Sequence, residues 1–314
     1  MQGEEGHHDH VPVYESGSEV LQKLQEKWSS TKQQRYPAMY SSVVGGIILD
    51  PSMMIIPIDD HMVHRGHGVF DTAMLSDGYL YELDSHLDRL LVSASKAKIS
   101  SPFSRETLRA ILVQMTAASK CRNGSIKYWL SAGPGDFLLS PKGCTAPAFY
   151  AVVIASGATA GGHPRLREGV RAITSTVPMK DPFFAAMKSV NYLANALAMA
   201  EAEERGAYAS VWVDGGGGVA EGPMMNVAFV TGGGDLVVPA FDRVLSGCTA
   251  GRLLALAPRL VDAGVLRSVG AVRISAADAR RCSEMMFVGS GLPLLPIVKW
   301  GKLHLPYLTC SAKT

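Results

Sequence analysis

A short stretch of small and polar residues, Ala155 to Pro164, divides the 314-residue chain into two halves. Its sequence, ASGATAGGHP, is typical of a flexible connection and not of a helix or strand. A chain of this length can bury more than one hydrophobic core. We therefore expect a polar N-terminal extension over residues 1–36, a small domain over 37–154, a linker over 155–164 and a larger domain over 165–314.

Both halves mix helical and strand patterns, which predicts the α+β class. In the first half we expect helices at 20–28, 83–98 and 105–120, and strands at 125–131, 149–154 and within 38–58. Asp84 is the expected N-cap of helix 83–98, Asp50-Pro51 an expected turn, and Asp77-Gly78 a hairpin turn between strands 72–75 and 79–83.

In the second half we expect helices at 190–205 and 249–263, and strands at 170–176, 210–214, 219–230, 284–288 and 294–300. Gly206 follows the first helix, as is typical of a helix end. Four consecutive glycines, 215–218, could cradle a phosphate group. No helix start follows them, so a hairpin turn is the favoured interpretation, and the same holds for the glycines at 232–234.

Composition excludes several classes of protein. The chain is 47% hydrophobic and 18% charged, with a net charge of +2, which does not favour nucleic acid or an anionic membrane as a partner. Its five cysteines are dispersed and form no C-x-x-C pair, which is typical of free thiols. No apolar run reaches the roughly 18 residues that a membrane span needs.

The N-terminus has neither the apolar core of a secretory signal nor the Arg-rich, acid-poor pattern of a transit peptide. We therefore expect the cytosol, or the chloroplast if the sequence is a mature or alternative form. Three histidines at 61, 64 and 67, and three more near the N-terminus at 7, 8 and 10, could suggest a metal. The spacing of the first three in a short turn-and-strand segment gives no convergent face, and histidines on a flexible terminus are more often incidental, so we expect no metal.

Two charged residues carry the main chemical hypothesis. Lys188 opens the expected helix 190–205, and Glu221 lies 33 positions later (221 − 188) on an expected strand. A buried lysine can lose its proton and attack an aldehyde. A carboxylate can keep a pyridine nitrogen protonated, so that the ring withdraws electrons. This pair suits pyridoxal 5′-phosphate (PLP), which also needs a phosphate anchor.

Three segments could supply that anchor. Thr249 begins an expected helix after Gly247, where backbone N–H groups point toward an anion. Ser290 lies between two glycines that connect two expected strands, and Arg89 offers a charged fork from the first half. Each of these three signals is weak alone, and it is their joint order along the chain that favours a PLP site over chance occurrence.

That order resembles the class IV aminotransferase family, also known as the D-alanine and branched-chain aminotransferases. The matching segments are GHGVFDT (66–72), LDSHLDRL (83–90), KSVNY (188–192), AEG (220–222) with Asn226, LSGCT (245–249) and residues 284–296. Within the family, DDHMVHRGHG (59–68) and YWLSAGPGDF (128–137) look like the plant D-amino-acid transaminase branch, some members of which also act as aminodeoxychorismate lyase.

The resemblance implies PLP fold type IV, with the cofactor between two domains of a homodimer subunit. It implies that Lys188 binds the cofactor and moves the proton, and that Glu221 holds the ring nitrogen. Residues implied at the phosphate are Arg89, Cys248, Thr249 and Ser290. Tyr192 would touch the cofactor, although branched-chain members have their tyrosine one residue further from the lysine.

Three departures from the family concern the substrate and the chain end. Phe70 stands where bacterial D-amino-acid transaminases have a tyrosine, and residues 131–139 lack their Arg-x-His pair for the substrate carboxylate. Lys127 matches an arginine of some branched-chain enzymes and could replace the lost charge. The family continues after Trp300 with a strand turn and a terminal helix, whereas residues 301–314 are short and unlike it.

The resemblance thus implies a ping-pong transaminase that moves an amino group from a D-amino acid to a 2-oxo acid. One alternative is aminodeoxychorismate lyase, which makes 4-aminobenzoate and pyruvate. Others are a branched-chain L-amino-acid aminotransferase, or a PLP-binding protein with little activity.

Overall fold

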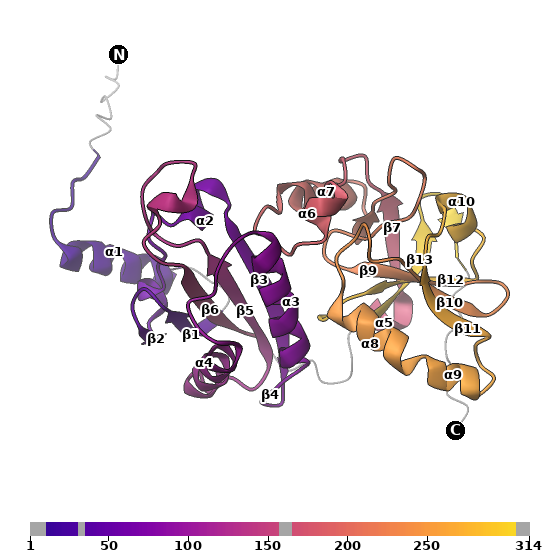
Figure 1. Ribbon diagram of the computed structural model, residues 1–314, viewed down its shortest axis with the longest axis horizontal. Helices are drawn as coiled ribbons and strands as arrows, with labels where there is room; N and C mark the ends of the chain where they lie inside the picture. Colours follow the sequence, from indigo (N-terminus) through magenta and orange to yellow (C-terminus); the bar gives the residue numbers. More distant parts are fainter. Residues whose placement is uncertain (1–10, 31–34, 157–164, 306–314) are drawn as a thin grey trace, which may run out of the picture.

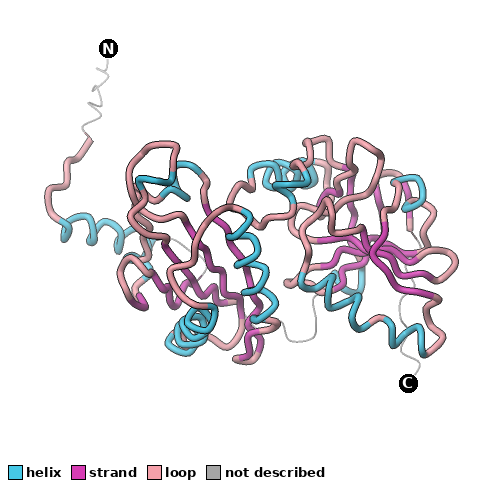
Figure 2. Tube along the Cα trace, viewed as in Figure 1, coloured by secondary structure: helices cyan, strands magenta, loops and turns pink. Residues whose placement is uncertain are grey.

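Two β-sheets, each with its own hydrophobic core, organise the computed structural model (Figure 1). The structure describes residues 11–30, 35–156 and 165–305. The strands of the two sheets are built from separate halves of the sequence, and Figure 2 shows them as two groups with helices around each. The expected linker over 155–164 falls mostly on residues 157–164, which lie outside the described residues.

The first sheet has six strands, and two helices cover one of its faces. In spatial order its strands are β2 (Gly46–Ile48), β1 (Arg35–Ser41), β6 (Ala148–Ala155), β5 (Gly124–Ser131), β3 (Gly68–Ser76) and β4 (Tyr79–Leu80). The accompanying helices are α1 (Gly17–Ser30), η1 (Pro51–Met53), α2 (His61–Arg65), α3 (Leu83–Lys96), α4 (Arg105–Ala118) and η2 (Pro141–Gly143). Leucines at helical spacing on α3 and α4 pack on this sheet, which explains why these two helices form where expected.

The second sheet has eight strands and contains both parallel and antiparallel pairs. Its strands are β11 (Ser268–Val272), β10 (Asp235–Pro239), β9 (Asn226–Val230), β12 (Glu284–Val288), β13 (Leu294–Trp300), β7 (Val170–Thr174) and β8 (Ala209–Val211), with β14 (Leu303–His304) beside β13. Its helices are α5 (Arg165–Glu168), α6 (Pro182–Ala185), α7 (Leu193–Glu204), α8 (Cys248–Leu256), α9 (Pro258–Asp262) and α10 (Ala276–Ala279).

The expected turns are confirmed where turn residues decide the backbone. Asp77 and Gly78 both have positive φ, 51° and 88°, and they connect β3 to β4 as a hairpin. The glycines 215–218 form a tight turn in which the Asp214 carboxylate accepts the N–H groups of Gly216 and Gly218. Gly206 follows α7 with φ 62°, as its position predicted.

Several element boundaries differ from expectation for identifiable reasons. Helix 249–263 is broken into α8 and α9 at Pro258, which lacks the N–H that a continuous helix needs. The turn expected at Asp50-Pro51 takes the form of the short helix η1, which the Asp50 side chain caps by accepting the Ser52 N–H at 2.9 Å. Asp84 is not the N-cap of α3, because the helix begins at Leu83 and Glu82 takes the N-cap position; the Asp84 carboxylate instead pairs with Arg105 and Arg109 of α4.

The most important difference concerns Lys188, which does not open a helix. Helix α7 begins at Leu193, and the non-helical segment 187–192 before it pairs with β3 of the first sheet through a bridge between Ser189 and Val69. Phe70 N–H donates to Lys188 O at 2.8 Å, and Val190 N–H donates to Gly68 O at 3.0 Å. These bonds satisfy backbone groups that a helix would otherwise have used. The lysine thus lies where the two halves of the chain meet.

Glu221 also lies outside a regular strand. The expected strand 219–230 is interrupted, and β9 begins only at Asn226. Residues 220 and 221 still pair with Trp212 through the backbone, and the chain then bends at Gly222 and Pro223. Among the described residues, no helix is both long and apolar enough to cross a bilayer.

Candidate active site

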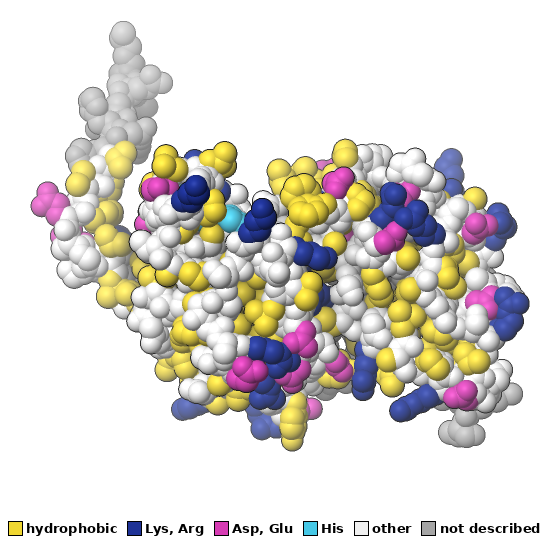
Figure 3. Space-filling model, in the orientation of Figure 1, with side chains coloured by type: hydrophobic (Ala, Val, Ile, Leu, Met, Phe, Trp, Pro, Cys, Tyr) yellow, Lys and Arg dark blue, Asp and Glu magenta, His cyan; other side chains and the backbone are white. Residues whose placement is uncertain are grey.

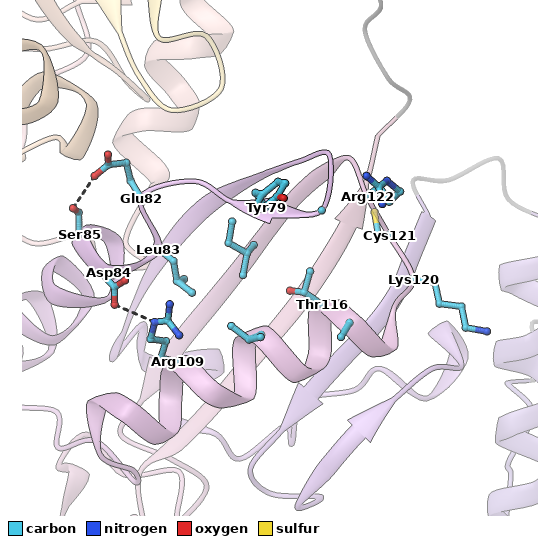
Figure 4. Close-up of a pocket in the computed structure, with 14 residues that line it drawn as sticks. Tyr79, Glu82, Leu83, Asp84, Ser85, Arg109, Thr116, Lys120, Cys121 and Arg122 are labelled. Atoms are coloured by element: carbon cyan, nitrogen blue, oxygen red, sulfur yellow. Dashed lines mark hydrogen bonds and ion pairs between the residues drawn. The ribbon is translucent and has the colours of Figure 1, made fainter.

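A cleft of about 800 Å³ contains none of the nine candidate site residues. It lies between the β3–β4 hairpin, the start of α3 and the end of α4 (Figure 4). Its polar side chains are already engaged with each other: Ser85 donates to Glu82, and Arg109 donates to Asp84. Their mutual bonds make this cleft a poor candidate for the chemistry.

A second cavity, of about 340 Å³, is lined by residues from both halves of the chain. All nine candidate residues line it: Phe70, Arg89, Lys127, Lys188, Tyr192, Glu221, Cys248, Thr249 and Ser290. They come from β3, α3, β5, the segment before α7, the bend before β9, the start of α8 and the loop after β12. The fold therefore brings together residues up to 220 positions apart (290 − 70) in the sequence.

The Lys188 amine is held among aromatic side chains. Its Nζ donates to the Tyr192 hydroxyl at 3.2 Å and lies 4.8 Å from the centre of the Phe70 ring. Phe70 and Tyr192 contact each other edge to face, with ring centres 5.0 Å apart. The shorter spacing between Lys188 and Tyr192 therefore still allows the two side chains to meet.

Burial makes the Lys188 amine easier to deprotonate. Removal from water, followed by the nearby Arg89 charge, lowers the pKa of Lys188 to about 8, although Asp71 and Glu221 oppose the change. An amine with this pKa is partly neutral at neutral to mildly alkaline pH. It can then act as a nucleophile or a base.

Glu221 shows the opposite shift. Its side chain is buried, and burial raises the pKa of this carboxyl to about 7, opposed chiefly by the Lys180 charge. Its Oε2 accepts the Leu245 N–H at 3.2 Å and the Asn226 side-chain N–H at 3.4 Å. Among the described residues, its Oε1 has no hydrogen-bond partner. A cationic N–H group in the cavity would match that oxygen.

Hydroxyl and backbone groups form an anion cup at one side of the cavity, made of Arg89, Cys248, Thr249 and Ser290. The Thr249 and Ser290 hydroxyl oxygens are 3.4 Å apart. Cys248 and Thr249 open α8, whose first N–H groups have no acceptor within the helix. Such a helix start, with hydroxyls and a guanidinium beside it, suits a phosphate group.

A buried carboxylate, Asp71, fixes the guanidinium of this cup. Asp71 accepts from Arg89 Nε and Nη2, both at 2.8 Å, and from His86 Nδ1 at 2.8 Å. Burial alone would raise the pKa of Asp71, but the bonds from Arg89 and His86 lower it to about 2. The Arg89 Nη1 atom reaches Ser246 O at 3.3 Å, so the same side chain joins α3 to the loop before α8.

Successive side chains of β3 and β5 point to opposite faces of the sheet, which separates the charge network of Asp71 from the opposite wall of the cavity. Phe70, Thr72 and Met74 line the cavity, whereas Asp71 points to the side covered by α3. Lys127 on β5 lies opposite Thr72, with its Nζ 4.7 Å from the Phe70 ring centre. Burial, and then the Lys188 charge, lower the pKa of Lys127.

Sequence reasoning did not identify the partners that hold the candidate residues. Asp71 and His86 lie in the quoted motifs but were given no role, although His86 and Arg89 have the i,i+3 spacing of one helix face. Lys180, whose Nζ is 4.7 Å from the Tyr192 ring centre, had no sequence signal. The buried Asn195, which lines the cavity, was also missed.

The histidines of α2 and of the connection between α2 and β3 contact each other rather than the cavity. His61 Nδ1 is 3.2 Å from His67 Nδ1, and His64 packs on Phe137. In the part of the chain that is described, no cluster of three or more His, Cys, Asp or Glu side chains could hold a metal ion. The histidines at 7, 8 and 10 lie outside that part.

Comparison with known proteins assigns a family to these features. Residues 68–300 match the family model described as amino-transferase class IV. The chain is 56% identical to a D-amino-acid transaminase, chloroplastic, from Arabidopsis thaliana, over 85% of this chain and 70% of the relative. It is 30% identical to a bifunctional aminodeoxychorismate lyase / D-amino acid transaminase from Mycobacterium tuberculosis, over 68% of this chain and 76% of the relative. The fold is similar to an Escherichia coli branched-chain amino acid aminotransferase, with TM-score 0.78 and 20% identity over 86% of this chain and 88% of the other.

The lowered pKa of Lys188 predicts selective chemical labelling. At pH 8 about half of its amines are neutral, whereas an exposed lysine with a pKa near 10.4 is less than about 1% neutral. With the cofactor removed, we expect trinitrobenzenesulfonate to label Lys188 about tenfold faster or more than the exposed Lys120, measured by peptide mass spectrometry. Equal rates at both lysines would contradict this prediction.

Proposed function

Because this chain belongs to the class IV aminotransferase family, we propose that it is a PLP-dependent transaminase that moves an amino group from a D-amino acid to a 2-oxo acid. The family is PLP-dependent, and the 56% identical Arabidopsis relative is described as a D-amino-acid transaminase. The observation that carries the proposal is the convergence of Lys188 and Glu221 on one cavity with an anion cup.

The residues present fit PLP in three respects. Glu221 Oε1, without a partner in the described structure, would accept the N–H of the pyridinium ring. The cup at the start of α8 would hold the phosphate through Arg89, Thr249 and Ser290, with backbone N–H groups of Cys248 and Thr249. Lys188 would bind the aldehyde carbon, with Tyr192 beside it at 3.2 Å. When bound, PLP supplies a ring that withdraws electrons from the substrate Cα–H bond.

Proton transfer is assigned to Lys188. Its Nζ would take the proton from the substrate Cα. A pKa of about 8 keeps a useful fraction of this amine neutral near physiological pH. Phe70 and Tyr192 hold the amine in place and exclude water on their side.

Lys127 would bind the substrate carboxylate. Among the described residues it makes no ion pair, and its contacts are with the rings of Phe70 and Trp129, at 4.7 and 5.6 Å from their centres. A cation without a counter-charge in a cavity wall favours an anionic ligand. This residue would replace the arginine and histidine that residues 131–139 lack.

The compartment and the assembly are also proposals. The chloroplast designation of the Arabidopsis relative favours the chloroplast over the cytosol for this chain. A homodimer, which the family resemblance implies, is supported by exposed apolar side chains on α6 and α7 (Figure 3). Phe183, Phe184, Leu193 and Leu197 are all at least 49% exposed there.

A second candidate function is aminodeoxychorismate lyase. The Mycobacterium tuberculosis relative is described as both a lyase and a D-amino acid transaminase. A lyase would use Lys188 and Glu221 in the same positions and would release pyruvate without an acceptor.

The main prediction concerns turnover by the PLP-loaded protein. With D-alanine and 2-oxoglutarate we expect pyruvate to form, and Lys188→Ala to lower the rate by at least about 100-fold because the proton carrier is lost. Pyruvate formation is followed with lactate dehydrogenase.

Formation of 4-aminobenzoate from aminodeoxychorismate without an oxo acid would favour the lyase. Preference for L-leucine over D-alanine would favour a branched-chain enzyme, and an absorbance band of bound PLP without any turnover would leave only a binding protein.

Substitution of Lys127 tests its assignment to the substrate. We expect Lys127→Met, which keeps the length and removes the charge, to raise the KM for D-alanine about tenfold, the cost of one charge-assisted hydrogen bond. The absorbance of bound PLP should not change. An unchanged KM would show that the carboxylate binds elsewhere.

The apolar surface of α6 and α7 tests the assembly. We expect sedimentation to give a mass of two 33.5 kDa chains, and Phe183→Asp to shift the protein toward the monomer because a charge cannot be buried there without a partner. Tyr79→Asp, at an exposed site on the β3–β4 hairpin, is the matched control. A monomeric unmodified protein would refute the homodimer.

A further inference from the structure

One buried histidine connects the Asp71 network to the hydroxyl groups of the anion cup. His86 is 1% exposed. Its Nδ1 lies 2.8 Å from Asp71 Oδ1, and its Nε2 lies 3.4 Å from Ser290 Oγ. Ser290 Oγ in turn is 3.4 Å from Thr249 Oγ1. The two ring nitrogens therefore face different partners, one a carboxylate and the other a hydroxyl of the cup.

The carboxylate determines which protons the ring carries. Ionised Asp71 can only accept hydrogen bonds, so Nδ1 must bear a proton. A neutral His86 would then have a bare Nε2, which would accept the Ser290 hydroxyl hydrogen and leave only oxygen lone pairs toward the cup. A charged His86 bears a proton on Nε2 as well and donates it to Ser290 Oγ. The hydroxyl hydrogen is then free to point at an anion.

We propose that His86 is a positioning residue that, as an imidazolium ion, turns the Ser290 hydroxyl toward the phosphate of the bound cofactor. This inference rests on the proposed PLP-dependent function and adds a residue that acts through Ser290. It assigns to the α3 histidine a task distinct from that of Arg89, whose guanidinium reaches the cup directly.

The charges around His86 favour its protonated form. Burial alone would lower the pKa of His86, but the bond to Asp71 and the neighbouring Cys248 raise it to about 9. The charged or titratable groups that face this cluster are Asp71 on β3, Arg89 on α3, Cys248 on α8, Tyr128 on β5 and Lys188 before α7. Asp71 accepts hydrogen bonds from both Arg89 and His86, but its single negative charge neutralises only one of these two cations. The negative charge of a phosphate would neutralise the other.

The test compares cofactor affinity with and without the Ser290 hydroxyl as the pH rises. Pyridoxamine 5′-phosphate is the probe because it cannot bond covalently to Lys188, and above pH 7.5 its phosphate is fully ionised. At pH 7.5 we expect Ser290→Ala to raise the Kd about tenfold, as for the loss of one hydrogen bond to a charged group. As the pH rises from 7.5 to 10 and His86 loses its proton, the ratio of the two Kd values should fall toward one. Fluorescence titration gives the Kd, and the ³¹P chemical shift of the bound probe reports the phosphate contacts.

Two histidine variants give the controls. In a His86→Gln background the side chain does not titrate, so the effect of Ser290→Ala should be the same at every pH. His64→Gln makes the same chemical change on α2, outside the cup, and should behave like the unmodified protein. Should His86→Gln fail to fold, a ratio that stays constant with pH in the comparison of the unmodified protein with Ser290→Ala would still overturn the proposal.

The possible outcomes distinguish a failure of the proposed function from a failure of the role assigned to His86. A probe that does not bind the unmodified protein overturns both the proposed function and the role of His86. A probe that binds with a Ser290→Ala ratio constant from pH 7.5 to 10 overturns the role of His86 alone. A ratio that falls with pH even in the His86→Gln background assigns the effect to another group and also overturns it.

Discussion

The pairing of the segment 187–192 with β3 is the constraint on which the site depends. Two backbone hydrogen bonds, Phe70 to Lys188 and Val190 to Gly68, set the lysine against a strand of the other half. Because these bonds do not involve side chains, they place Lys188 beside Phe70 whatever the cavity contains. The position of Tyr192, the residue immediately before α7, follows from the same geometry.

The charges of the cavity are divided into those that are neutralised within the protein and those that are not. The Asp71 carboxylate neutralises the Arg89 charge, and its own pKa is well below the usual value. This pairing avoids the roughly 3–5 kcal/mol penalty of an unpaired buried charge. Lys127 and Lys188 make no ion pair in the described structure, and burial lowers the pKa of both. Glu221 responds in the opposite direction. The protein thus leaves part of its positive charge available to an anionic cofactor and substrate.

The sequence predicted the features that depend on local chemistry. The turn at Asp77-Gly78 and the helices α3 and α4 follow from turn residues and apolar spacing, and the nine candidate residues do line one cavity. It could not predict that the residues before α7 pair with β3, because the competing partner lies more than 100 positions away. Nor could it predict the roles of Asp71 and His86, because the contact between these two side chains depends on which faces of β3 and α3 pack against each other. The assigned roles of the nine residues stay predictions.

Substitutions on the two faces of β3 are expected to have different effects, because the two faces contact different parts of the protein. Residues 70, 72 and 74 border the cavity, whereas the intervening Asp71 belongs to the charge network behind the strand. Under the proposed function, a replacement at Thr72 or Met74 would change the cavity surface that faces the substrate and leave the contacts of Asp71 with Arg89 and His86 in place. On the same proposal, natural variation or laboratory evolution could reshape substrate selectivity along this edge of β3 while the residues proposed to bind vitamin B6 stay unchanged.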